Sequence, residues 1–134
     1  MKRLVSVVLL VVMILTVCAT AFADHTFSTD SLAKTKANNF GNYQKTTANG
    51  TPAKVKDVSM SSKKATFHFR VWKHTGWQAS EGARITGSGS ATLKSLKDGN
   101  GEFRLWHNES YYLAATHSEK SKVNSASSSG KWVP

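Results

Sequence analysis

The sequence predicts an all-β protein, an antiparallel β-sandwich or small barrel of about seven to eight strands. Several short segments alternate apolar and polar residues and are rich in β-branched or aromatic side chains. Glycine, asparagine and serine turn signals separate these segments at a spacing of roughly ten residues. No window shows the sustained apolar period of about 3.6 residues that an amphipathic helix requires.

The clearest predicted strand covers residues 65–73. Side chains of a strand alternate between the two faces of a sheet, so every second residue shares a face. One face of this strand would carry Ala65, Phe67, Phe69 and Val71, and the other Thr66, His68, Arg70 and Trp72. This alternation predicts a sheet that buries its apolar face against a core.

Weaker alternation and turn residues define the rest of the predicted layout. Further strands are predicted at 25–32, 40–47, 53–60, 91–96, 102–107, 111–116 and 122–133. Turns are predicted around Asn49-Gly50, at 74–77 and at 98–101, and residues 87–90 are expected to form a loop or the bulged start of a strand. Residues 34–39 are expected to be a loop, and the Ser- and Lys-rich segment 118–130 a mobile loop or an edge.

The first residues have the order of a secretory signal peptide. Met1-Lys2-Arg3 is positively charged, residues 4–17 are almost unbroken apolar, and Ala21-Phe22-Ala23 offers small residues at the cleavage site. The apolar run is shorter than the roughly 20 residues that a membrane-spanning helix needs. We therefore expect cleavage after residue 23, a signal peptide at 1–23 and a single secreted domain at 24–134.

The only cysteine, Cys18, lies inside the predicted signal peptide. Attachment of a lipid to Cys18 is an alternative, but Val17 is unsuited to the position before a lipidated cysteine. Residues 24–134 contain no cysteine, so the secreted domain must be stabilised by packing or by assembly with partners rather than by disulfides. Bacterial surface proteins, above all those of Gram-positive species, are often built in this way.

The charge of the secreted domain is strongly positive. Of 18 basic residues, 16 remain without Lys2 and Arg3, against 8 acidic residues, which gives a net charge of about +8. Such a charge attracts polyanions, or it serves only to keep the protein soluble. The predicted partner is an anionic cell-wall polymer or a membrane surface, and no nucleic acid is expected in that compartment.

Catalytic motifs are not recognisable in this sequence. The five histidines are scattered without metal-binding spacing and are expected to be solvated or at edges, so no metal and no cofactor is predicted. Glu81, Glu102 and Glu109 are the carboxylates that a hydrolase would use, but all three flank turns. Gly87-Ser88-Gly89-Ser90 lacks the strand-to-helix context of a nucleophile elbow. We predict that the protein is not an enzyme.

The most informative group of side chains combines aromatic and basic residues. Arg70 and Trp72 lie two residues apart in one predicted strand, as do Arg104 and Trp106 in another, so each pair should share a face opposite the core. Exposed tryptophan suits stacking on sugars, contacts with cations or membrane interfaces, and arginine beside it suits phosphate or carboxylate. In the alternative, this face packs under a second sheet and the arginine heads reach solvent. The predicted binding residues are Arg70, Trp72, Lys73, Trp77, Arg104, Trp106, Tyr112 and Trp132.

Several short motifs, taken in their order along the chain, are shared with a known group of proteins. They are Phe27, Tyr43-Gln44-Lys45-Thr46, Lys54-Val55-Lys56, the Gly-Ser-Gly element at 87–89, Phe103-Arg104-Leu105 with Asn108, and Ser129-Gly130-Lys131-Trp132. With these motifs, the secreted domain resembles a family of small secreted proteins of Gram-positive bacteria. Their function is not known, and their genes often lie beside ABC-transporter genes of bacteriocin loci. The likeness is poorest between Lys73 and Arg84, and the acidic tail of the family is missing. The resemblance implies a secreted Gram-positive protein linked to antagonism or immunity.

The sequence therefore leads to three functional expectations. The first is a basic, non-enzymatic β protein that binds an anionic component of the bacterial envelope through its aromatic and basic face. The alternative is a bacteriocin-like antimicrobial protein that acts on neighbouring cells. The second alternative is a secreted hydrolase.

Overall fold

The computed structural model describes residues 24–134, so the predicted signal peptide at 1–23 lies outside the described residues. The regular secondary structure of the described part consists of ten strands. They are β1 (His25–Ser28), β2 (Leu32–Ala33), β3 (Ala37–Gln44), β4 (Ala53–Met60), β5 (Thr66–Lys73), β6 (Ala83–Thr86), β7 (Ser88–Leu93), β8 (Ser110–His117), β9 (Ser125–Ala126) and β10 (Ser128–Val133). Within residues 24–134, no helix has the length and the apolar character that crossing a membrane requires. The prediction of an all-β fold is confirmed.

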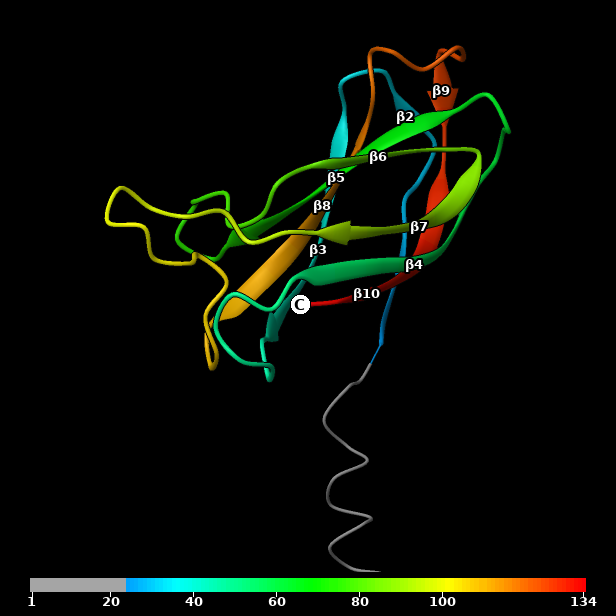
Figure 1. Cartoon of the computed structure of the whole chain (residues 1–134). Helices are drawn as coiled ribbons and strands as arrows, with labels where there is room; N and C mark the ends of the chain where they lie inside the picture. Colours follow the sequence, from blue (N-terminus) through cyan, green and yellow to red (C-terminus); the bar gives the residue numbers. More distant parts are fainter. Residues whose placement is uncertain (1–23) are drawn as a thin grey trace, which may run out of the picture.

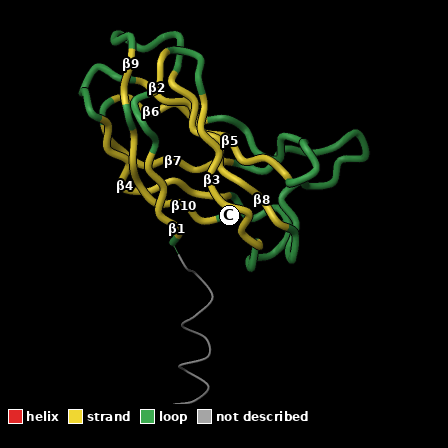
Figure 2. Tube along the Cα trace, turned by 180° about the vertical axis from the view of Figure 1, so that it is seen from behind, coloured by secondary structure: helices red, strands yellow, loops and turns green. Residues whose placement is uncertain are grey.

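Two four-stranded antiparallel sheets make up most of the fold (Figure 1). The first, which we call the β4 sheet, has the order β1-β10-β4-β7, and the second, the β5 sheet, has the order β3-β8-β5-β6. β2 and β9 form a separate two-stranded pair. The chain passes directly from the β5 sheet to the β4 sheet at Gly87, which separates β6 from β7. Figure 2 shows the same strands from behind, with loops extending from one end of the sheets.

The core lies between the two sheets. The ring of Phe27 on β1 contacts Phe40 on β3 and Phe69 on β5, at centroid separations of 5.4 Å and 5.7 Å. Contacts between rings of opposite sheets are what a sandwich core requires. The largest fully buried side chains are Trp132, Tyr111, Lys45, Phe67, Phe69, Leu93, Leu105, Leu113, His117, Val55, Val71 and Ser80.

The strand with the strongest alternation is the one that the sequence predicts best. β5 covers Thr66–Lys73, and its residues alternate between buried and partly exposed along its length. The predicted core face is confirmed, since Ala65, Phe67, Phe69 and Val71 are all fully buried. The strand predicted at 53–60 coincides with β4.

Two predictions near the middle of the chain are wrong. β6, Ala83–Thr86, has no counterpart among the predicted strands, because its four residues bury only Ile85 fully and give too short a pattern. The predicted strand at 102–107 is a loop whose single ladder contact is an isolated bridge from Lys97 to Phe103. In such a strand, with Arg104 and Trp106 facing away from the core, Phe103 would share the core face with Leu105, but Phe103 is 41% exposed and Leu105 is buried.

The last third of the chain is also more ordered than its composition suggests. Segment 118–130 is in part the expected loop and edge, since 118–124 contain no strand and β9 pairs only with β2, but Ser118, Ser121 and Ser128 are buried and β10, which begins at Ser128, lies between β1 and β4. Segment 34–39 is only partly a loop, since β3 starts at Ala37. The hydroxyls of Ser118 and Ser121 accept the backbone amides of Lys120 and Thr66, whereas the buried hydroxyl of Ser128 has no hydrogen-bond partner within residues 24–134.

One histidine differs from the expectation that all are solvated or at edges. His117 is fully buried, its ring stacks on Phe67 at 5.1 Å, and its Nδ1 lies 2.7 Å from the carbonyl oxygen of Leu32. The imidazole therefore connects β8 to the short strand β2, which is a structural role.

Candidate functional site: an aromatic pocket and an arginine face

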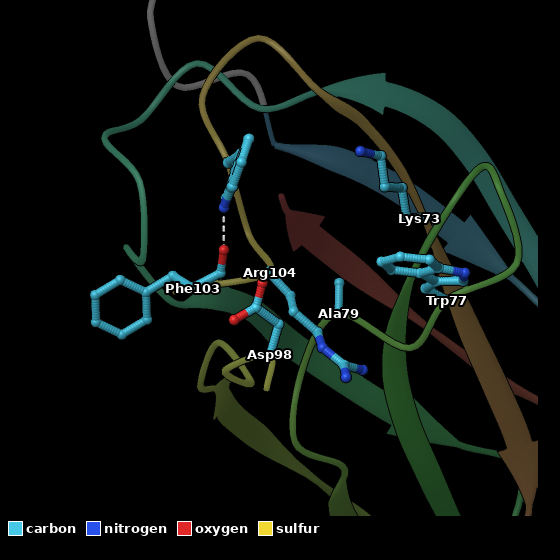
Figure 3. A pocket seen from close by; sticks show the side chains of 7 residues that line it. Lys73, Trp77, Ala79, Asp98, Phe103 and Arg104 are labelled. Atoms are coloured by element: carbon cyan, nitrogen blue, oxygen red, sulfur yellow. Dashed lines mark hydrogen bonds between the residues drawn. The ribbon is translucent and has the colours of Figure 1, made fainter. Parts of the chain in front are cut away.

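Three large hydrophobic side chains are exposed in the described part of the chain, and all three line one pocket. Trp77 is 64% exposed, Phe103 41% and Trp106 40%. The pocket has a volume of about 140 Å³ and lies beside the end of β5 (Figure 3). We call it the aromatic pocket, and its lining residues are Lys73, Trp77, Ala79, Asp98, Phe103, Arg104 and Trp106.

Trp77 reaches the aromatic pocket from the turn that follows β5. The amide of Lys73 donates to the carbonyl oxygen of Trp77 over 2.7 Å, and the amide of Gly76 donates to the carbonyl oxygen of Lys73 over 2.9 Å. These two hydrogen bonds close a tight turn. The Trp77 ring is therefore held at one wall while it stays open to solvent.

The opposite wall belongs to the loop between β7 and β8. The hydroxyl of Tyr111 accepts the amide hydrogen of Trp106 over 2.7 Å and donates to the carbonyl oxygen of Arg104 over 2.8 Å. The hydroxyl of Ser95 accepts the amides of Arg104 and Leu105 over 3.1 Å and 3.0 Å. Burial raises the pKa of Tyr111, so its hydroxyl keeps the proton that it donates. Hydrogen bonds to side chains thus hold this loop in place, because it has no continuous strand ladder.

Replacing Tyr111 by phenylalanine should loosen this wall of the pocket. The change removes both hydrogen bonds and leaves two backbone groups without a partner, at a cost of about 1–3 kcal/mol. We expect a lower free energy of unfolding in urea and faster hydrogen exchange of the Trp106 amide. Tyr112→Phe is the matched control, since the structure shows no hydrogen bond to the hydroxyl of Tyr112. Equal exchange in both variants would show that Tyr111 does not hold the loop.

Phe103 is positioned by contact with the turn before β4. Gly50 has a positive φ of 78°, and a Cβ at Gly50 would collide with the ring of Phe103. The ammonium group of Lys97 lies 5.0 Å from the centroid of the same ring. The Asn-Gly turn predicted from the sequence therefore has a second role, which is to let an aromatic ring pack directly on its backbone.

Charges of both signs surround the aromatic pocket. Arg104 donates through Nη1 to the carbonyl oxygen of Gln78 over 3.0 Å, while its Nε is buried without a partner. Lys73 forms an ion pair with Glu109 at 3.2 Å. Asp98 accepts backbone amides of its own turn from Asn100 and Glu102. The pocket itself is thus close to electrically balanced. The dashed line in Figure 3 marks the hydrogen bond from the Trp106 indole to the carbonyl oxygen of Phe103.

A second surface lies on the outer side of the β5 sheet, and we call it the arginine face. Arg70 and Trp72 are partly exposed between the buried residues of β5. Tyr112 on β8 is partly exposed and lies directly opposite Trp72. Two further residues, His68 on β5 and Arg84 on β6, complete this face and are paired across the two strands.

The predicted site residues are therefore divided between two places. Lys73, Trp77, Arg104 and Trp106 meet in the aromatic pocket, and Arg70, Trp72 and Tyr112 lie on the arginine face. The expectation that Arg104 and Trp106 share a sheet face with Arg70 and Trp72 is wrong, because residues 102–107 form no strand. Trp132 belongs to neither surface. It is fully buried in the core, since it is an inward residue of the central strand β10.

Five residues of these surfaces were not among the predicted binding residues, namely Ala79, Asp98, Phe103, His68 and Arg84. Phe103 was assigned to the core, and Asp98 was considered only as a turn residue. Arg84 lies on the strand that was not predicted, so its pairing with His68 had no signal. The alternation that placed His68 beside Arg70 in one strand was the available clue.

Among residues 24–134, no three histidine, cysteine, aspartate or glutamate side chains lie close enough together to hold a metal ion.

No protein-family model matches the chain, and no curated protein matches it either. The resemblance to the small secreted proteins of bacteriocin loci therefore stays a prediction. Among solved structures, the chain is similar to a family two carbohydrate esterase from Cellvibrio japonicus, with 12% sequence identity and a TM-score of 0.33. The similarity covers 83% of this chain and 33% of that chain, so this chain corresponds to about a third of the esterase.

Proposed function

We propose that the protein is a secreted, non-enzymatic module that binds an anionic polymer of the bacterial envelope. One observation carries the proposal. The three exposed large hydrophobic side chains of the described domain, Trp77, Phe103 and Trp106, all line one pocket that also contains Arg104 and Lys73. Exposed aromatic rings gathered in one place are typical of a surface that binds a ligand.

The size of the aromatic pocket supports a small ligand unit. Its volume of about 140 Å³ lies below the roughly 300–1,000 Å³ of pockets that enclose drug-sized molecules. A single sugar ring of a polymer would fit, with the rest of the chain in solvent. Tryptophan suits such a ring, because its apolar face stacks on C–H groups while its N–H can form a hydrogen bond.

The distribution of charge separates two contributions to binding. The aromatic pocket is nearly balanced, since Lys73 is paired with Glu109 and Asp98 lies near Arg104. Attraction to an anionic polymer would come from the net charge of the domain, about +8, and from the arginine face. Binding should therefore weaken as salt screens these charges.

The test is cosedimentation of residues 24–134 with purified Gram-positive cell walls at increasing salt. We expect Trp77→Ala and Trp106→Ala each to weaken binding by about tenfold or more, as the loss of an aromatic anchor does. Thr75→Ala is the matched control, because Thr75 is exposed in the same turn as Trp77. The wild-type protein should bind less at high salt.

Two outcomes would overturn the proposal. In the first, both tryptophan variants sediment with walls as the wild-type protein does. In the second, the wild-type protein stays in the supernatant at low salt.

A further inference from the structure

Two arginine side chains flank one histidine on the outer side of the β5 sheet. His68 on β5 is directly paired with Arg84 on β6, and Arg70 is the next residue of β5 on the same face. Neighbouring strands lie about 4.8 Å apart, and residues two apart on a strand lie about 7 Å apart. Long arginine side chains at these positions reach a common point.

The ring of His68 reaches across to the residues just before β6, the strand that carries Arg84. A Cβ at Gly82 would collide with Nε2 of His68, so the imidazole packs directly on the backbone of Gly82. Gly82 precedes Ala83, which is the partner of Phe69. The imidazole therefore leans along β5 toward the position of Arg70.

Within residues 24–134, no ion pair with a carboxylate includes these side chains. The ion pairs within residues 24–134 are Lys56–Asp24, Lys73–Glu109 and Lys131–Asp57, and none includes Arg70 or Arg84. On the other side of β5, the residues opposite His68 and Arg70 are Thr116 and Ala114 of β8, which carry no charge. Glu81, just before Gly82, is exposed and forms none of these pairs.

The excess of positive charge affects the pKa of His68. Burial and the positive charges of Arg70 and Arg84 lower the pKa of His68 to about 4. A neutral imidazole at physiological pH leaves both guanidinium groups free to bind an anion from the side open to solvent.

We infer that Arg70 and Arg84 hold a phosphate group between their guanidinium groups. Each guanidinium presents a fork of N–H donors, which suits the unesterified oxygens of a phosphate group. Trp72 and Tyr112 lie one step further along the same face and suit the carbon part that carries the phosphate. The inference names the anionic group of the polymer, a phosphodiester, and in that respect it rests on the proposed function.

The phosphate site is tested first without any polymer. NMR titration gives the pKa of each histidine in inorganic phosphate and in chloride at equal ionic strength. We expect phosphate to raise the pKa of His68 by about one unit or more, which corresponds to a roughly tenfold preference for the charged imidazole. His107, exposed in the loop before β8, is the internal control and should not respond.

Variants assign the effect to the two arginines. Arg70→Gln and Arg84→Gln should each raise the pKa of His68 in chloride and abolish the response to phosphate, while Arg104→Gln should leave the response unchanged. A response in the wild-type protein that is no larger than that of His107 would overturn the inference. So would a response that survives in both arginine variants.

The source of the phosphate is tested with walls and vesicles. If wall polymers supply it, Arg84→Gln should bind native walls about tenfold less tightly than the wild-type protein but should equal it on walls stripped of phosphate. Equal loss on both walls would overturn the phosphodiester assignment. If anionic phospholipid supplies the phosphate, Arg84→Gln should instead lose binding to phosphatidylglycerol vesicles, which would overturn the wall source. The tryptophan variants of the pocket test the proposed function separately, because they leave the response of His68 to phosphate intact.

Discussion

Replacing Trp132 by alanine should destabilise the domain by about 3–5 kcal/mol, as large-to-small changes of buried aromatic residues do. The Trp132 side chain is fully buried, and its ring lies near those of His25 and Tyr43, at centroid distances of 6.1 Å and 5.8 Å. It sits on β10 between Val55 of β4 and His25 of β1. The cavity would thus open between the two sheets, since Tyr43 belongs to β3 of the β5 sheet. Unfolding in urea, followed by circular dichroism, measures the loss.

Two further variants make the prediction on Trp132 decisive. Trp132→Phe keeps an aromatic ring and removes the pyrrole part of the indole, whose N–H is buried without a partner, so we expect a smaller loss than for alanine. Trp77→Ala, at a ring that is 64% exposed, should change stability by about 0.5 kcal/mol or less. A loss for Trp132→Ala as small as that for Trp77→Ala would show that the Trp132 side chain is exposed rather than buried.

Lys45 should make the stability of the domain rise between pH 8 and pH 10.5. Its side chain is fully buried, and its ammonium group donates to the carbonyl oxygen of Thr51 over 2.9 Å and to the hydroxyl of Thr47. Burial lowers the pKa of Lys45 from 10.5 to about 8. Between these values the unfolded chain binds more protons than the folded one, so raising the pH favours folding. The shift corresponds to about 3 kcal/mol.

The effect is measured as a difference between two proteins. The free energy of unfolding of the wild-type protein minus that of Lys45→Met should increase by about 3 kcal/mol from pH 8 to pH 10.5 and stay constant below pH 8. Subtraction removes the titration of the other lysines and of the tyrosines. Lys54→Met, at an exposed lysine of β4, should show no such slope. A difference that does not change with pH would mean that the Lys45 ammonium is solvated.

The sequence predicts those strands whose own residues alternate clearly between apolar and polar side chains. β5 alternates along nearly its whole length, and β4 alternates on both sides of a register shift between Val55 and Val58, so the side-chain period of two determines which face is buried. β6 has four residues, and segment 118–130 consists largely of serine and lysine, so neither shows the alternation that separates strand from loop. These segments acquire their structure from neighbouring strands.

For the candidate site too, the sequence predicts only what a single strand determines by itself. Arg70 and Trp72 were placed correctly on the outer face because the alternation of β5 determines it. Arg104 and Trp106 have the same spacing, but Leu105 and the hydroxyls of Ser95 and Tyr111 hold them in a loop. Spacing within one segment cannot show hydrogen bonds that come from other segments. The pairing of His68 with Arg84 is likewise a property of two strands together.

The antiparallel pairing of β1 with β10 determines how the domain responds to mechanical force. His25 is paired with Trp132, so Asp24 and Pro134 lie at the same end of this pair. Tension applied between these two residues loads the hydrogen bonds one after another, starting from that end, as in the opening of a zipper. A domain tethered at residue 24 and pulled at residue 134 would therefore yield at low force, starting with the separation of β1 from β10.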